Sequence, residues 1–355
     1  MKQNPTQSAR LRSWFTLALL IVSIVAFSRT LFAAELEDRT QKDIQVKPGT
    51  TLFLDADFGG VEVKAATGNT VHVDVYRKVE ASTKEEAQRI LDDYSLTSTN
   101  EGDQLHLRGE FKTGWGPYRG SGRHNHCHND QCLTYADSLR EFQYVLSVPT
   151  QLNLHIRTEA GEVTVPDVGG ALDIETSAGG IEAGNVAREA SLRTAGGSIR
   201  VGKIGGRATL DTAGGNIESG DINGDADVNT AGGSIRLGKV NGPVKAKTAG
   251  GEIRIESATG SVNAKTVGGS ISASLSKLQG ASSLETLAGN VTLYLPPDVK
   301  ANIQAETRGA GDEIENEFAP DQDEGHRAGV PINGGGPEVF LKASYGRVQV
   351  RKNTF

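Results

Sequence analysis

The chain has few of the residues that fill an irregular hydrophobic core. Aromatic residues make up 5% of its 355 residues, and it contains one Met. A large compact core normally uses Phe, Tyr, Trp and Met to fill irregular space. The 44 Gly residues indicate instead many tight turns between short, regular strands. The composition therefore argues against ordinary globular cores, although the length would allow two or three domains.

An excess of basic residues is also missing. The formal net charge is −7, whereas a surface that binds phosphate groups needs more Lys and Arg than Asp and Glu. We therefore expect no nucleic acid among the partners of this protein.

Residues 1–34 have the pattern of a signal peptide or an N-terminal anchor. Basic residues precede an apolar run from Trp14 to Phe27, which has the length of a signal-peptide core and is short for a membrane span. We expect cleavage near residues 33–34, but the bulky residues 31–32 leave an uncleaved anchor as the alternative. The pattern predicts an exported protein in the periplasm, on the cell surface or secreted, with membrane contact only through this segment if it is uncleaved.

A threonine recurs every 18 residues along the middle of the chain. Five copies open the phrase T-A-G-G-x-I or T-V-G-G-S-I, and a further copy, T-L-A-G-N-V, begins at Thr286 after a two-residue insertion. A constant period of this kind is typical of a repeat fold. The threonines of the unbroken series are Thr158, Thr176, Thr194, Thr212, Thr230, Thr248 and Thr266.

Each repeat divides into two nine-residue halves, and each half predicts a strand. Gly-Gly or Asn-Gly pairs fall between the halves, as at 214–215 and 223–224, and we expect corners there because these residues tolerate positive φ. Apolar residues alternate between the corners, as at Ile199 and Val201. Strands that recur once per rung lie parallel, about 4.8 Å apart. The sequence thus predicts an all-β fold, a single-chain parallel β-solenoid with 18-residue rungs and two strands per rung.

The repeated threonine is expected to face the interior. Counting by two from the inward-facing Leu210 places Thr212 on the inner face. Its methyl group would pack against the threonines above and below, and its hydroxyl would reach a backbone carbonyl at the corner. We therefore predict a structural ladder of Thr176, Thr194, Thr212, Thr230, Thr248 and Thr266.

The segments on either side of the repeats are expected to cap the solenoid, because an open end would pair with another chain. The N-terminal cap should be rich in strands and contain one helix near Thr83–Tyr94, with Ser82 or Thr83 as its N-cap. The expected division is 1–34 for the signal peptide or anchor, 35–149 for the N-terminal cap, 150–295 for the solenoid and 296–355 for a C-terminal β cap.

Three features resemble the bacterial putative-adhesin family of exported β-solenoids. They are the series of T-x-G-G-x-[IV] rungs, the lead-in F-Q-Y-V-L-S-V-P at 142–149 and the exit V-T-L-Y-L-P-P-D at 291–298. The resemblance covers roughly residues 50–352. It implies the solenoid fold and a location in the cell envelope, and its motifs are structural rather than catalytic.

A loop at 114–133 departs from the family pattern and concentrates side chains that bind zinc or copper. Its two Cys are the only ones in the chain, and an even number in an exported protein favours a disulfide between them. Oxidised Cys residues cannot serve as thiolate ligands, so a disulfide and a metal site that uses both Cys exclude each other. The third possibility is a loop with neither a disulfide nor a metal site. The residues concerned are His124, His126, Cys127, His128, Asp130 and Cys132.

Two acidic segments partly match calcium-binding patterns. Asp221, Asn223, Asp225 and Asp227 begin such a pattern, but Ala226 stands where a Gly is needed, and we expect a solenoid corner there. The acidic stretch from residue 312 to 324 is expected to be a solvated loop.

We expect no catalytic site on the solenoid. An enzyme on this fold needs carboxylates or His residues from adjacent rungs that converge in a cleft. The best candidates are Asp173 and Glu175, but Arg193 follows one rung later, which favours an ion pair. Near neighbours in the two outward columns that begin at Glu175 and Glu182 often alternate in sign, and neither column contains an aromatic residue. No His is expected to point outward from the rungs.

The sequence favours a non-enzymatic exported or cell-envelope scaffold of the adhesin type, which presents an extended β-surface for binding and needs no cofactor. Its partner would be an unidentified envelope or cell-surface protein or glycan. Two alternatives remain, namely a glycan-acting β-helix enzyme and a periplasmic metal-handling protein that uses the His/Cys loop.

The disulfide is testable on the exported protein. Mass spectrometry of protein purified without reductant should identify a peptide in which Cys127 is joined to Cys132. Two free thiols together with one zinc or copper ion per chain would contradict the disulfide and favour the metal site.

Overall fold

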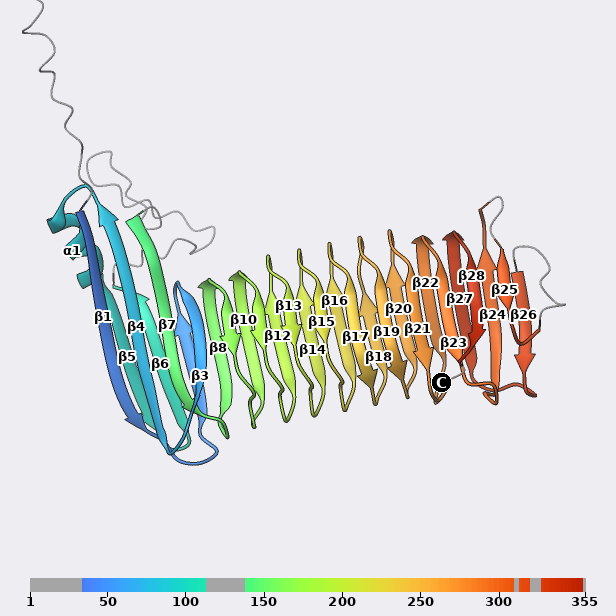
Figure 1. Cartoon of the computed structure of the whole chain (residues 1–355), viewed down its shortest axis with the longest axis horizontal. Helices are drawn as coiled ribbons and strands as arrows, with labels where there is room; N and C mark the ends of the chain where they lie inside the picture. Colours follow the sequence, from blue (N-terminus) through green and yellow to red (C-terminus); the bar gives the residue numbers. More distant parts are fainter. Residues whose placement is uncertain (1–33, 113–137, 310–312, 320–326, 354–355) are drawn as a thin grey trace, which may run out of the picture.

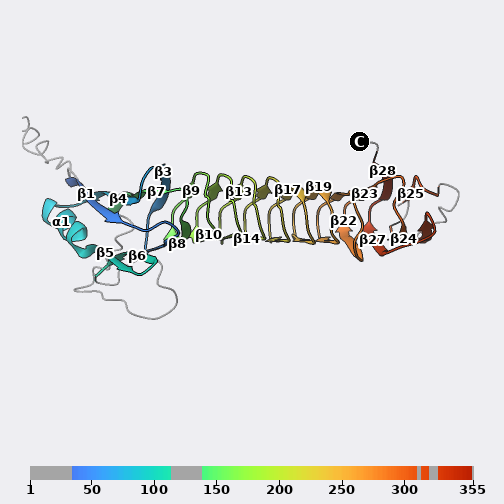
Figure 2. The same cartoon turned by 90° about the horizontal axis from the view of Figure 1, so that it is seen from below.

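The computed structural model describes residues 34–112, 138–309, 313–319 and 327–353. These residues form a long rod in which two 14-stranded sheets lie face to face (Figures 1 and 2). Along the middle of the rod the chain passes from one sheet to the other and back once per rung. We call the sheet that contains β9 (Val163–Val165) sheet A and the sheet that contains β8 (Asn153–Ala160) sheet B.

The repeat segment alternates between strands in sheet B and strands in sheet A, all parallel. The predicted β-solenoid with two strands per rung is confirmed. Sheet B continues with β10 (Leu172–Ala178), β12 (Ala190–Thr194), β14 (Ala208–Thr212), β16 (Ala226–Thr230), β18 (Val244–Lys247), β20 (Val262–Thr266) and β22 (Ser282–Ala288). Sheet A continues with β11 (Ile181–Ala183), β13 (Ile199–Val201), β15 (Ile217–Ser219), β17 (Ile235–Val240), β19 (Ile253–Ala258), β21 (Ile271–Leu275) and β23 (Val291–Leu295).

Equivalent residues of successive rungs pair in register, so the core consists of columns of similar side chains. In sheet B, Leu192 pairs with Leu210, and in sheet A, Ile199 pairs with Ile217; all four are fully buried. The sequence did not predict a third buried column at the Asn-Gly edge. There Val186, Ile204, Ile222 and Val240 are joined by parallel bridges outside the regular strands.

The predicted positive φ occurs at the corner glycines Gly161, Gly179 and Gly289 but not in the regular rungs, where the glycine is needed for a different reason. In the regular rungs Gly197 and Gly215 do not have φ in the left-handed region. A Cβ at Gly197 would lie 2.0 Å from the Gly179 carbonyl oxygen, and a Cβ at Gly215 would lie 2.1 Å from the Gly197 carbonyl oxygen. Close stacking of backbone on backbone, rather than positive φ, therefore excludes a side chain here.

The N-terminal cap extends both sheets. β2 (Thr51–Ala56) pairs in parallel with β8, and β3 (Gly60–Ala66) with β9. β6 (Gln104–Phe111) and β7 (Leu139–Pro149) then add outside β2 and β3, although they come later in the chain. Parallel pairing therefore includes strands that come before residue 150, where the sequence predicted the start of the solenoid.

Antiparallel strands and the single helix of the described residues close this end. β4 (Thr70–Ala81) pairs with β7, β1 (Ala34–Gln45) with β4, and β5 (Tyr94–Glu101) with β6. The helix α1 (Lys84–Asp93) begins at the predicted N-cap, where the Thr83 hydroxyl accepts from the Glu86 N–H at 3.1 Å. The buried Arg77 pairs with Asp38 of β1 and donates to the Leu91 carbonyl of α1, which fixes strand and helix together.

The C-terminal end also contains a crossover. After β23 the chain forms β24 (Ala301–Thr307), β25 (Ile314–Asn316) and β26 (Arg327–Ile332) at the far end of the rod. It then returns, so that β27 (Glu338–Tyr345) lies between β22 and β24, and β28 (Val348–Lys352) lies between β23 and β25. The antiparallel strand β26 covers the edge of β24.

The glycine contact predicts different outcomes for two neighbouring substitutions. Gly197→Ala should lower the free energy of unfolding by about 1–3 kcal/mol, because the new methyl group overlaps a backbone carbonyl. Gly196→Ala should change it by less than about 0.5 kcal/mol, since its nearest non-neighbouring atom would be 3.9 Å away. Urea unfolding of both variants measures the difference, and equal losses would contradict the stacking explanation.

Candidate binding surface

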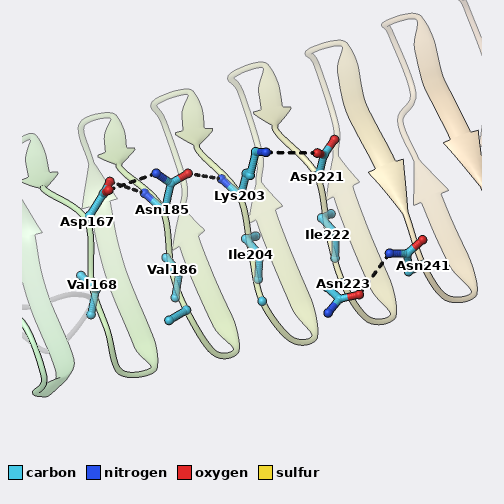
Figure 3. Close-up of a pocket in the computed structure, with 12 residues that line it drawn as sticks. Asp167, Val168, Asn185, Val186, Lys203, Ile204, Asp221, Ile222, Asn223 and Asn241 are labelled. Carbon is cyan, nitrogen blue, oxygen red and sulfur yellow. Dashed lines mark hydrogen bonds and ion pairs between the residues drawn. The ribbon is translucent and has the colours of Figure 1, made fainter.

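A shallow groove of about 450 Å³ follows the edge of the rod where the Asn-Gly corners lie. Val186, Ile204 and Ile222 of the third buried column line it, and Asp167 and Asn185 stand beside them (Figure 3). It follows the rod axis, so equivalent positions of successive rungs contribute to it in turn.

The polar side chains of this groove already bond to the next rung. Asp167 accepts from the Asn185 backbone N–H at 2.7 Å and from its side-chain amide at 3.0 Å, which lowers the pKa of the Asp167 carboxyl below its ordinary value. The Asn185 oxygen accepts from the Lys203 N–H at 2.9 Å (Figure 3). Asp221 accepts from the Lys239 N–H at 3.1 Å. These side chains therefore stabilise the fold, because each accepts a hydrogen bond from a backbone N–H that has no other partner at the corner.

The predicted threonine ladder lies on the inner face at the opposite edge. Each hydroxyl donates to a glycine carbonyl of the preceding corner, at 2.7 Å from Thr212 to Gly197 and at 2.8 Å from Thr230 to Gly215. The hydroxyls of Thr194, Thr212, Thr230 and Thr248 also accept from the corner N–H three residues on, as Thr212 does from Gly215 at 3.3 Å. In these four threonines the hydroxyl both donates and accepts, so it joins one corner to the next. The predicted members Thr176, Thr194, Thr212, Thr230, Thr248 and Thr266 are all buried.

The outer side of this threonine edge is a shallow groove with an apolar floor. It has a volume of about 570 Å³, and Ala195, Ala213 and Ala231 line it. The residue equivalent to these alanines becomes larger toward the C-terminal end, where Val267 and Leu287 are each 48% exposed.

Many neighbouring charges in the outward columns are opposite in sign and form ion pairs. Arg193 lies 3.6 Å from Asp211 in sheet B, and Arg200 lies 3.5 Å from Glu218 in sheet A. All four side chains are well exposed, so each pair contributes little to stability.

The sequence matches the model of the family described as Toastrack DUF4097 over residues 50–351. The chain belongs to this Toastrack family. The match confirms the resemblance to the putative-adhesin family and covers nearly the same residues as expected. Among curated proteins no relative matches the chain.

Three solved structures are similar to this Toastrack chain. A putative adhesin from Bacteroides fragilis has 13% sequence identity and a TM-score of 0.32, with 88% of this chain and 97% of that chain covered. A putative lipid binding protein from Parabacteroides distasonis has 12% identity and a TM-score of 0.37, with 88% and 97% covered. A putative cell adhesion protein from Clostridium sporogenes has 10% identity and a TM-score of 0.19, with 89% and 100% covered.

The carboxylates considered for catalysis lie on the open outer face of sheet B. The Asp173 carboxylate lies 3.1 Å from His155 Nδ1 and 4.0 Å from Arg193 Nη1, and the Glu175 carboxylate lies 3.5 Å from Arg157 Nε. The expectation of an ion pair with Arg193 thus applies to Asp173, with His155 as a closer partner.

The expectation that no His points outward from the rungs was wrong. His155 points outward from β8, and its ring stacks on Phe53 of β2 at a centroid distance of 4.7 Å. His106 of β6 covers the other face of Phe53 at 4.5 Å. Both faces of the Phe53 ring are covered by the two His rings, so Phe53 offers no open face on which a sugar ring could stack. The alternation in L-N-L-H-I-R, in register with L-D-I-E, was the signal that could have placed His155 outward.

The calcium-like segment is a corner, as expected, and its acidic groups are divided among different partners. Asp225 lies 2.7 Å from Arg207, and Asp227 lies 3.0 Å from Lys245. Burial acts to raise the pKa of Asp227, but hydrogen bonds from Lys245 and Asn229 hold it below its ordinary value. Over the described ranges no three His, Cys, Asp or Glu residues are arranged to hold a metal ion.

Several sequence predictions concern residues outside the described part of the chain. They include the signal segment and the loop that contains His124, His126, Cys127, His128, Asp130 and Cys132. The described part of the acidic stretch forms β25 and its flanks, where Glu315 and Glu317 pair with Arg351. In the described residues no helix has the length and apolar character needed to cross a membrane.

Proposed function

We propose that this Toastrack chain is a non-enzymatic, exported scaffold of the adhesin type that binds through its long outer faces. The observation that carries the proposal is the register of the two sheets. Because equivalent residues pair rung on rung from β8 to β22, each outward position recurs as a straight column along the rod.

Such columns suit a partner that is itself extended or repeated. Each rung would add a weak polar contact, and contacts made by one rigid body add up to a stable attachment. A cell surface or an envelope glycan offers repeated groups of this kind. An exported location agrees with the apolar segment near the N-terminus.

The glycan-acting enzyme has less support. Its best candidate carboxylates, Asp173 and Glu175, are engaged with His155, Arg193 and Arg157 on an open face. Catalysis needs groups that converge on one reacting atom in a site that excludes water.

The removal of one whole rung distinguishes the scaffold from the enzyme. Deletion of Ser177–Thr194 joins Thr176 to Ala195, restores the phrase T-A-G-G-S-I and removes no net charge. The shortened rod should fold and should still adhere to intact bacterial cells or isolated envelopes, with reduced affinity, because only one of many equivalent rungs is lost. Adhesion of fluorescently labelled protein to these particles measures the effect.

A nine-residue deletion of Ser177–Asn185 is the matched control. It puts unlike halves of the repeat in contact and should misfold. Release of soluble sugar from envelope polysaccharide by the full chain, lost on clean removal of the 18 residues, would contradict the scaffold.

A further inference from the structure

The longest open sheet edge among the described residues lies at the N-terminal end of the rod. Sheet A ends there at β1 and sheet B at β5, and at the far end they finish at β25 and β26 (Figure 1). β1 has 12 residues, whereas β5 has 8, β26 has 6 and β25 has 3. A long open edge is a template on which a strand of another chain can pair.

The backbone groups that face this edge belong to the odd-numbered residues of β1. The Val46 N–H donates to the carbonyl of Asn69, which precedes β4, at 2.8 Å. In an antiparallel strand the backbone groups of successive residues point to opposite sides, so the even-numbered residues of β1 bond to β4. The Gln45 carbonyl agrees with this, because it accepts from the Asn100 side chain of β5 at 3.0 Å. Among the described residues nothing bonds to the backbone groups of Glu35, Glu37, Arg39, Gln41 and Asp43.

The inward side chains of β1 are incompletely covered. Leu36 and Ile44 pack against the core but are only partly buried. Their register partners on β4, Val79 and Val71, are fully buried. The difference arises because β4 has a neighbouring strand on each side, whereas β1 has one in the described part of the chain. A further strand beyond β1 would complete the sheet.

The charges of β1 favour one way of pairing it with a second copy of itself. Charged residues protect an edge strand when pairing would place like charges opposite each other. Antiparallel pairing about residue 38, 39, 42 or 43 would place a charged side chain opposite its own copy. Pairing about Thr40 would place Glu37 opposite Asp43. Pairing about Gln41 places no like charges opposite each other, and it places Arg39 opposite Asp43 on both sides of the two-fold axis.

Arg39 and Asp43 are accessible for this contact. Their side chains are 60% and 70% exposed. Each already has a partner on β4, since Arg39 lies 3.5 Å from Asp74 and Asp43 bonds to His72. A guanidinium group has five N–H donors and a carboxylate has two oxygens, so both retain bonding capacity. Hydrogen bonds between them would be charge-assisted.

The other opposite pairs of this register are compatible with one another. They would be Glu35 with Lys47, Leu36 with Val46, Glu37 with Gln45, Asp38 with Ile44, and Thr40 with Lys42. The Asp38 charge is already matched within its own chain by the buried Arg77. Lys78 lies 2.8 Å from Glu35 and 3.6 Å from Glu37, so these two carboxylates are also partly neutralised.

We propose that two copies of this chain join at their β1 strands, antiparallel and centred on Gln41, to form a rod of twice the length. Arg39 of each copy binds Asp43 of the other, and the open backbone groups of the two strands pair. Sheet A then continues across the joint, and the two C-terminal ends point apart. The doubled rod presents two sets of outer faces to one extended partner, which strengthens attachment without any new kind of contact.

Sedimentation equilibrium of the mature chain tests the dimer, and the wild type should reach twice the monomer mass. R39D and D43R should each weaken association about tenfold or more, because each places like charges opposite each other. The double variant R39D/D43R restores opposite charges and should associate within about threefold of the wild type. The control R188D reverses a charge that is 61% exposed in the solenoid, and it should change association by less than about twofold.

Disulfide trapping tests the register. Gln41→Cys places a thiol at the two-fold axis, where the two Cα atoms would be about 5.5 Å apart, within reach of a disulfide. Mass spectrometry of the oxidised protein should then find the peptide around position 41 joined to its own copy. Gln45→Cys is the matched control, because its two copies would lie about 27 Å apart and should not join.

A wild type that stays monomeric at the highest concentration measured would overturn the proposal. A double variant as weak as the single ones, or equal trapping at positions 41 and 45, would overturn the register. Circular dichroism checks that each variant is folded. If R39D fails this check, the comparison of D43R with the double variant still tests the contact.

Discussion

The fold depends on one backbone carbonyl per rung. The Gly197 carbonyl oxygen accepts the Thr212 hydroxyl at 2.7 Å, and the same oxygen would lie 2.1 Å from a Cβ at Gly215. A single acceptor thus requires both a threonine and a glycine in the following rung. The arrangement repeats at Gly215, which accepts from Thr230. The phrase T-A-G-G is therefore a stacking unit, and its spacing fixes the 18-residue period.

Close stacking also determines where function can lie. Short glycine corners leave no long loops in the rungs to build walls around a pocket, so ligands must use open faces and edges. At the Asn-Gly edge, Asp167 and Asn185 are occupied by hydrogen bonds to the next rung. The exposed faces remain, and on most of them the charges neutralise one another. In sheet A one exception is the register pair Arg236 and Arg254, two neighbours of like charge.

The sequence predicted features that depend on local periodicity and could not predict those that depend on distant pairing. The inward position of Thr212 and the cap at Thr83 follow from nearby residues. The crossovers that place β7 beside β3 and β27 beside β22 join strands far apart in the chain, and no short pattern encodes them. β1 was missed because it consists mainly of polar and charged residues with few apolar ones. The ion pair between Asp225 and Arg207 likewise depends on how adjacent rungs stack, which no short pattern in the sequence shows.

The central claim is that the 18-residue unit stacks on itself with one fixed register. Small-angle scattering tests this most directly on a chain in which residues 195–248, three whole rungs, are duplicated in tandem. The longest dimension of the particle should increase by about 14 Å at an unchanged cross-section, because each rung adds about 4.8 Å. An unchanged length, or scattering typical of an added disordered segment, would contradict the account.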